Sequence, residues 1–155
     1  MKGRDDVIQV LNEVLCAELT AINQYFVHAM MCKNWGYLRL AERTRKESVE
    51  EMKHAQLVIE RILFLEGTPN MQKYMRINVG ATVQEQLTFD LDVEVEGVGR
   101  LNAGIELRAS PGTTGRALLE GILREEEEHI DWLEAQLQQI RDIGIQGYLA
   151  EQTKE

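Results

Sequence analysis

The sequence is poor in cysteine, proline and aromatic residues, with two cysteines, two prolines and 6% aromatics, and it has no long apolar run. Two cysteines exclude a disulfide-stabilised scaffold, and on one helix Cys16 and Cys32 would lie about 24 Å apart, too far to bridge. A transmembrane helix needs about 20 apolar residues, and the first residues do not resemble a signal peptide. We therefore expect a cytoplasmic protein with no membrane span and with reduced, inert thiols.

Positive charge is also scarce: the sequence has 17 Lys and Arg residues and 26 Asp and Glu residues, which give a formal net charge of -9. This balance argues against nucleic acid and anionic membranes as partners and is compatible with cations. A length of 155 residues without a change in composition predicts a single domain over residues 1–155. The wealth of good helix formers predicts an all-α fold.

Apolar residues recur with helical spacing in four segments, which predicts helices over residues 5–35, over 37–66, from 82 onward and over 114–143. Gly36 and Gly67 are predicted to end the first two helices, and the capping-box pair Thr82 and Glu85 opens the third. Three glycines make the middle of the third helix its least certain part, and residues 110–113 form a predicted turn.

Residues 67–81 have no clear period and are too many for a tight turn, so we predict a long crossover. Gly144 is expected to stop the fourth helix, leaving residues 145–153 for a short fifth one. Two antiparallel helix pairs joined by a crossover make a four-helix bundle of the kind that holds di-iron carboxylate sites.

Each predicted helix carries a glutamate near the middle of its apolar stripe, and two of these have a histidine three residues later, on the same helix face. One such pair is common by chance, and a lone glutamate in a stripe usually reaches water. Four carboxylates buried together, however, cost several kcal/mol each and are tolerable only around cations. The predicted metal ligands are therefore Glu18, Glu51, His54, Glu94, Glu126 and His129.

Four carboxylates and two imidazoles suit a pair of Fe or Mn ions and, less selectively, Zn or Co. We expect Glu51 and Glu126 to bridge the two ions. Each ion then keeps one histidine and one terminal carboxylate, Glu18 or Glu94. Positions left open on redox-active ions suit chemistry with oxygen or peroxide.

Three further residues lie close to this set. Tyr25, on the face of Glu18, either donates a hydrogen bond or an electron to the centre or is a plain core residue, and both interpretations stay open. Asp90 and Glu47 are interpreted first as solvated or capping residues, with a supporting role beside the ligands as the alternative.

Met52 follows Glu51 by about 100° of helix rotation, so it points to the flank of the bundle. A flank methionine is usually an interface or gap-filling residue, but a thioether is also an axial ligand for haem iron. An apolar wall from the first helix suits either a haem or a dimer interface: Leu19, Ile22, Asn23 and Phe26.

Five segments resemble signature segments of the bacterioferritins: residues 23–26, 34–36, 47–55, 59–67 and 127–134. The resemblance extends over nearly the whole chain, and the methionine within residues 51–54 is typical of bacterioferritins rather than of ferritins without haem. It implies a ferritin-like bundle that assembles into a cage of about two dozen subunits.

The resemblance also implies function. Fe(II) would be oxidised by O2 or H2O2 at a dinuclear ferroxidase centre within each subunit, whose ligands are the six residues above, and stored as a ferric mineral. Haem b would lie on a two-fold axis between the Met52 side chains of two subunits, and a ferredoxin-type reductase would supply electrons to release the iron. Lys46 stands where many members have a histidine that, with the counterpart of Glu50, binds iron on the inner surface, so that accessory site is not expected.

Two other functions remain open from the residues. One is a di-iron or di-manganese peroxidase or catalase that works as a small oligomer without storing iron. The other is a haem-dependent electron-transfer or assembly subunit of a mixed cage, in which this chain's own metal centre is idle.

Overall fold

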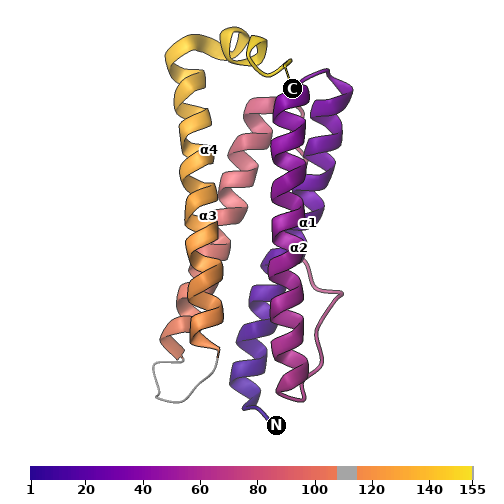
Figure 1. Ribbon diagram of the computed structural model, residues 1–155, viewed down its shortest axis with the longest axis vertical. Helices are drawn as coiled ribbons and strands as arrows, with labels where there is room; N and C mark the ends of the chain where they lie inside the picture. The colour runs from indigo at the N-terminus through magenta and orange to yellow at the C-terminus, as the bar shows by residue number, and fades with distance from the viewer. Residues whose placement is uncertain (108–114, 155) are drawn as a thin grey trace.

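The computed structural model describes residues 1–107 and 115–154, and these residues form four α-helices: α1 (Asp5–Asn34), α2 (Leu38–Phe64), α3 (Val83–Leu107) and α4 (Arg116–Ala150). The helices lie side by side as a bundle of two antiparallel pairs, α1 with α2 and α3 with α4, and α1 also packs on α3 (Figure 1). The prediction of an all-α four-helix bundle is confirmed. The turn predicted at residues 110–113 and the helix start predicted at residue 114 lie outside the described residues.

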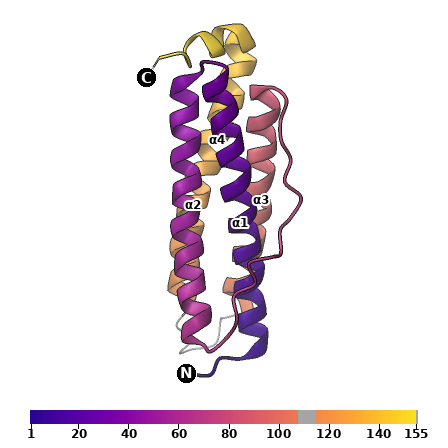
Figure 2. The ribbon, with the colours of Figure 1, turned by 90° about the vertical axis from the view of Figure 1, so that its right-hand side faces the viewer.

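The connection between α2 and α3 runs along the bundle beside α1, as predicted for a crossover (Figure 2). Three hydrogen-bond acceptors, spaced four residues apart on one face of α1, bind this connection: Thr20 Oγ1, Gln24 Oε1 and His28 Nε2. They accept the backbone N–H groups of Met75, Asn78 and Gly80 at 2.9, 3.0 and 3.0 Å. We call these three contacts the crossover ladder.

The first two helices end in left-handed residues, but only one of these is the glycine that the sequence predicts. Gly36 has φ 86 after α1, as expected. After α2 the left-handed residue is Glu66, with φ 60, and Gly67, which the sequence predicts to end this helix, follows it. Gly67 is needed for space instead, because a Cβ there would lie 2.9 Å from Cγ2 of Ile8.

The third helix is continuous through its glycines. A Cβ on Gly104 would lie 2.9 Å from Val10 Cγ1 and 3.0 Å from Leu119 Cδ1, so this glycine lets α1, α3 and α4 approach closely. Nothing lies within 4 Å of the corresponding point on Gly99. The predicted cap of α3 is present, because the Glu85 N–H donates to the side-chain oxygen of Thr82 at 3.2 Å.

Gly144 interrupts helical geometry with φ 78 and ψ 157, and beyond it the chain turns across the end of the bundle (Figure 1). The fifth helix predicted over residues 145–153 corresponds to the helical stretch beyond this bend, which reaches Ala150 as the last part of α4. The bent segment is anchored: the buried Tyr148 hydroxyl donates to Gln136 Oε1 at 2.8 Å, and the Arg39 N–H donates to the Gln152 carbonyl at 3.0 Å.

Two apolar clusters fill the two halves of the bundle. One includes Leu11, Leu15, Val58, Ile62, Leu101 and Leu119, and the other includes Leu40, Val83, Leu87, Leu133 and Tyr148. Cys16 and Cys32 are buried and free. The polar side chains that the sequence singles out lie between the two clusters, at the middle of each helix.

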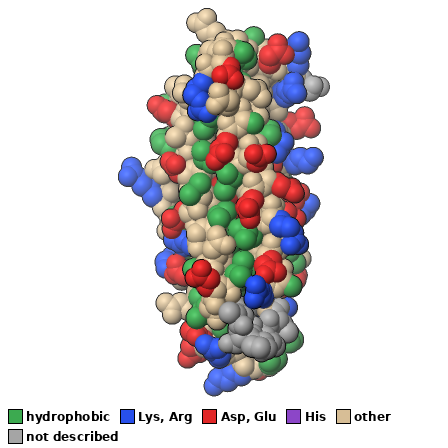
Figure 3. Space-filling view, turned by 90° about the vertical axis from the view of Figure 1, so that its left-hand side faces the viewer, with side chains coloured by type: hydrophobic (Ala, Val, Ile, Leu, Met, Phe, Trp, Pro, Cys, Tyr) green, Lys and Arg blue, Asp and Glu red, His purple; other side chains and the backbone are tan. Residues whose placement is uncertain are grey.

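The outer surface carries many carboxylates. On the face formed by α3 and α4, apolar side chains run between acidic ones, and no histidine is visible (Figure 3). A groove of about 530 Å³ on these helices is lined by Val98, Asn102, Glu127, Ile130, Asp131 and Glu134. None of the helices within residues 1–107 and 115–154 is both long and apolar enough to span a membrane.

Candidate metal centre

All six predicted ligands meet at the middle of the bundle, and each is only 1% to 5% exposed. Their ligand atoms form two groups, in each of which all atoms lie within 4.8 Å of one another. The first group is Glu18, Glu51, His54 and Glu126, and the second is Glu51, Glu94 and His129. Glu51 is common to both groups, as a bridging residue must be, whereas Glu126 belongs only to the first. The assignment of these residues as metal ligands stays a prediction.

The two histidines aim the same ring nitrogen inward. His54 Nδ1 lies 3.0 Å from Glu126 Oε1, 3.3 Å from Glu51 Oε2 and 3.5 Å from Glu18 Oε2. Across the centre, His129 Nδ1 lies 2.8 Å from Glu94 Oε1. Each imidazole therefore faces the carboxylates through one nitrogen, which is the arrangement that a nitrogen ligand to a shared cation requires.

The electrostatics of the centre favour a bound cation. Oε2 of Glu18 and of Glu94 is buried and has no hydrogen-bond partner among the described residues. Burial, and then the neighbouring Glu18 and Glu94, raises the pKa of Glu51 well above its usual value. Buried carboxylates that lack donors and repel one another are stabilised by cations, so the residues present fit a pair of divalent ions.

The histidines respond to the same carboxylates. Burial lowers the pKa of His54, but the adjacent carboxylates of Glu18 and Glu125 outweigh it and raise this pKa to about 9. The pKa of His129 is also raised, because Glu94 outweighs the effect of burial. Without metal, the centre therefore takes up protons, and metal binding must displace them.

Tyr25 is fully buried against the second group. Its hydroxyl donates a hydrogen bond to Glu94 Oε1, and its ring meets the His129 ring edge-on at 5.3 Å. Burial, and then the charge of Glu94, raises the pKa of Tyr25 well above 10, so it stays a neutral donor. The hydrogen-bonding role left open by the sequence is thus present, while a role as electron donor stays a prediction.

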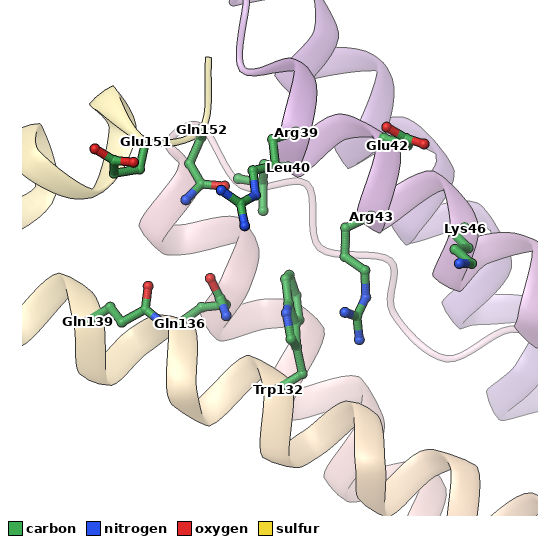
Figure 4. Close-up of a pocket in the computed structure, with 10 residues that line it drawn as sticks. All are labelled: Arg39, Leu40, Glu42, Arg43, Lys46, Trp132, Gln136, Gln139, Glu151 and Gln152. Carbon is green, nitrogen blue, oxygen red and sulfur yellow. The ribbon is translucent and has the colours of Figure 1, made fainter. Parts of the chain in front are cut away.

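Outside His129 lies an aromatic and cationic layer. The Trp132 ring stacks on His129 at 6.0 Å between centroids, and Cζ of Arg43 lies 4.3 Å from the centroid of Trp132. Figure 4 shows Arg43 and Trp132 side by side in a cavity of about 510 Å³. Arg43 also donates to Glu47 Oε1 at 2.9 Å, and Glu47 Oε2 lies 3.7 Å from His129 Nδ1. Glu47 therefore borders the centre and is not simply solvated.

Asp90 is not solvated either, and the interpretation of it as a solvated or capping residue is wrong. It is 4% exposed, and its Oδ1 accepts from Gln24 Nε2 at 2.9 Å. His28 Nδ1 lies 2.8 Å from the same oxygen, while His28 Nε2 accepts the Gly80 N–H. A neutral His28 therefore carries its proton on Nδ1 and donates it to Asp90. The sequence signal for His28 is its spacing of four and eight residues from Gln24 and Thr20.

Sequence reasoning also missed Glu125. Its Oε2 contacts His54 Nε2, on the side of the ring that faces away from the other carboxylates. The Glu125 side chain is 57% exposed and lies in a cavity of about 570 Å³ with His54, Glu50, Arg124 and Glu128 among its lining. No periodicity distinguishes it, because it belongs to a run of four consecutive glutamates.

Met52 is 58% exposed and turned away from the centre, as its rotation from Glu51 predicts. Phe26 and Val49 are also exposed, at 50% and 41%, on the neighbouring surfaces of α1 and α2. Leu19, expected in the same outer wall, is buried in the core instead. The exposed Lys46 has no carboxylate partner among the described residues, while Glu50 accepts from Lys53 Nζ at 2.9 Å.

Comparison with known proteins adds two findings. A family model described as a ferritin-like domain matches residues 8–143. The bacterioferritin of Mycobacterium leprae is 49% identical over 152 residues, which cover 97% of this chain and 96% of the relative. The bacterioferritin of Streptomyces coelicolor is 47% identical over 97% of this chain and 90% of its own length, and that of Brucella melitensis 41% identical over 96% and 92%.

Proposed function

Because the chain belongs to the bacterioferritin family, we propose that it stores iron, oxidising Fe(II) at its buried centre and keeping the ferric product inside a multi-subunit cage. The observation that carries this proposal is the convergence of four carboxylates and two imidazoles from all four helices, with two carboxylate oxygens left without partners. Oxygen-rich ligand sets with one nitrogen per ion suit iron.

In this proposal iron is the substrate. Glu51, which belongs to both groups, would bridge two ferrous ions, and Glu126 is proposed as the second bridge. His54 with Glu18 would complete one position, and His129 with Glu94 would complete the other. Each ferrous ion gives up one electron. Two ions reduce one H2O2, with two protons, to two water molecules, whereas four ions are needed to reduce one O2, with four protons, to two water molecules. Tyr25 holds Glu94 in place through its hydroxyl. The apolar clusters on both sides keep bulk water away from the ions.

We also propose a haem b site at Met52. A haem there would carry electrons, delivered by a ferredoxin-type reductase, to the stored mineral. Two observations support this site: the Met52 thioether is 58% exposed, and exposed apolar side chains accompany it on α1 and α2. A second copy of the chain would supply the opposite Met52 and cover the same apolar surface.

Ferrous oxidation tests the centre. The double variant Glu51→Ala, His129→Ala removes the shared carboxylate and one nitrogen, so rapid oxidation in stopped-flow absorbance should be lost. Glu128→Ala is the control, because Glu128 is exposed and forms no hydrogen bond or ion pair with another described residue. Equal rates in the double variant and the unmodified protein would contradict the assignment.

Two further measurements test storage and haem. Size exclusion should give a particle of about 430 kDa for about two dozen copies of the 17.8 kDa chain. A small oligomer that turns over peroxide would instead favour a peroxidase or catalase. Met52→Leu should remove the haem absorbance while leaving the particle size unchanged, and haem retained by that variant would exclude Met52 as its ligand.

A further inference from the structure

The two histidines of the centre, His54 and His129, differ in the surroundings of Nε2, the ring nitrogen that faces away from the inner carboxylates. His54 Nδ1 faces the inner carboxylates, and its Nε2 contacts the Glu125 carboxylate on the opposite edge of the ring. A nitrogen that binds a metal must present a lone pair, so the proton of the neutral ring must sit on the other nitrogen. Glu125 is positioned to accept that proton in a hydrogen bond and so favours the metal-binding tautomer.

His129 has no such partner. Its Nδ1 faces Glu94 and Glu47, and within residues 1–107 and 115–154 no carboxylate contacts its Nε2. Its ring lies between Tyr25, edge-on at 5.3 Å, and Trp132, stacked at 6.0 Å. On its Nε2 side, this ring is therefore oriented by packing, whereas the Nε2 side of His54 is oriented by a contact with the Glu125 carboxylate.

We infer that Glu125 is a positioning residue that makes the His54 half of the centre bind divalent metal more tightly than the His129 half. A carboxylate behind a ligating histidine fixes the ring and raises the basicity of the ligating nitrogen. This inference rests on the dinuclear centre of the proposed function. It adds that the two metal positions are unequal, and it names the side chain responsible.

The surroundings of Glu125 make it suitable for substitution. Its side chain is 57% exposed, so truncating it leaves no cavity in the core. Glu128, three residues later, lines the same cavity, is exposed and forms no hydrogen bond or ion pair with another described residue. Removing either carboxylate changes the net charge of the chain by the same amount, but only the Glu125 variant loses the contact with His54.

Titration of the metal-free assembled protein with Co(II), followed by its visible absorbance, tests the inference without relying on oxidation activity. The unmodified protein should bind two ions per chain. Glu125→Ala should weaken one of them by about 10- to 100-fold and leave the other unchanged. Glu125→Gln, which keeps a neutral acceptor, should lose less, and Glu128→Ala should bind as the unmodified protein does.

The possible failures are distinguishable. Unchanged affinity in Glu125→Ala, an equal loss at both positions, or the same loss in Glu128→Ala would overturn the role of Glu125 while leaving the dinuclear centre intact. Failure of the unmodified protein to bind two Co(II) ions would overturn the centre itself and the inference with it.

Discussion

Removing the metal should make the stability of the protein depend on pH in a way that the metal-loaded protein does not. In the metal-free fold the pKa of His54 is about 9, against an ordinary value of 6.5. The folded state then binds this proton more tightly than the unfolded state. The stabilisation is full below pH 6.5 and is lost as the pH rises through 9.

The size of the effect follows from those two values. At about 1.4 kcal/mol per pH unit between them, His54 contributes about 3 kcal/mol. With an unfolding entropy of about 2.1 cal/mol/K per residue, this corresponds to a fall in Tm of about 9 °C for the 155-residue chain. The pKa values of His129 and Glu51 are raised too, so these groups act in the same direction and add to the fall.

Scanning calorimetry of the chelator-treated assembled protein between pH 6 and 9.5 measures this fall. Zn(II) is the control, because an ion on Nδ1 of His54 excludes the proton and should abolish the His54 part of the slope. His54→Gln should reduce the fall in the metal-free protein by about the amount assigned to His54. A metal-free Tm that is constant or rises over this range would refute the reasoning.

Four substitutions test the packing around the centre by thermal unfolding. Gly104→Ala should destabilise the protein by about 2 kcal/mol through overpacking. Gly99→Ala, with open space around it, should stabilise α3 by up to about 1 kcal/mol. The opposite order would contradict the conclusion that Gly104, and not Gly99, is needed for close packing. Glu66→Gly should stabilise by about 1 kcal/mol, because glycine adopts φ 60 without strain, and a loss of stability would argue against this. His28→Ala should destabilise by about 2 kcal/mol or more and speed amide hydrogen exchange in the crossover, since it removes one of the two donors to Asp90 Oδ1 and leaves the buried Gly80 N–H unpaired. Unchanged exchange would contradict a stabilising role of the crossover ladder.

Helical spacing was sufficient to predict the bundle and the convergence of the six side chains. A buried face must be apolar, so a glutamate at the middle of such a face stands out, as Glu18 and Glu94 do, and a histidine three residues from Glu51 points the same way. The crossover was predictable because residues 67–81 show no period at all.

What escaped prediction depends on contacts between distant elements. Asp90 is polar and lies beside an apolar stripe, and only the packing of α1 against α3 reveals that Gln24 and His28 bury it. Glu125 is one of four consecutive glutamates, and the rotation of α4 decides which of them reaches His54. At the end of α2, the need for space beside Ile8 fixes Gly67 one residue beyond the left-handed position.

The crossover ladder fixes how far the connection between α2 and α3 advances along α1. Four residues of α1 advance by about 6 Å, close to the rise of two extended residues, so Gln24 and His28 match the step from Asn78 to Gly80. These hydrogen bonds therefore fix the position of the loop along α1 just before the first turn of α3. An extra residue inserted between Asn78 and Gly80 must bulge outward from the loop. Otherwise it would shift α3 by one residue, which is a rotation of about 100°, and would move Glu94 away from Tyr25 and His129. The position of Glu94 relative to the other predicted ligands therefore depends on a segment that supplies none of them.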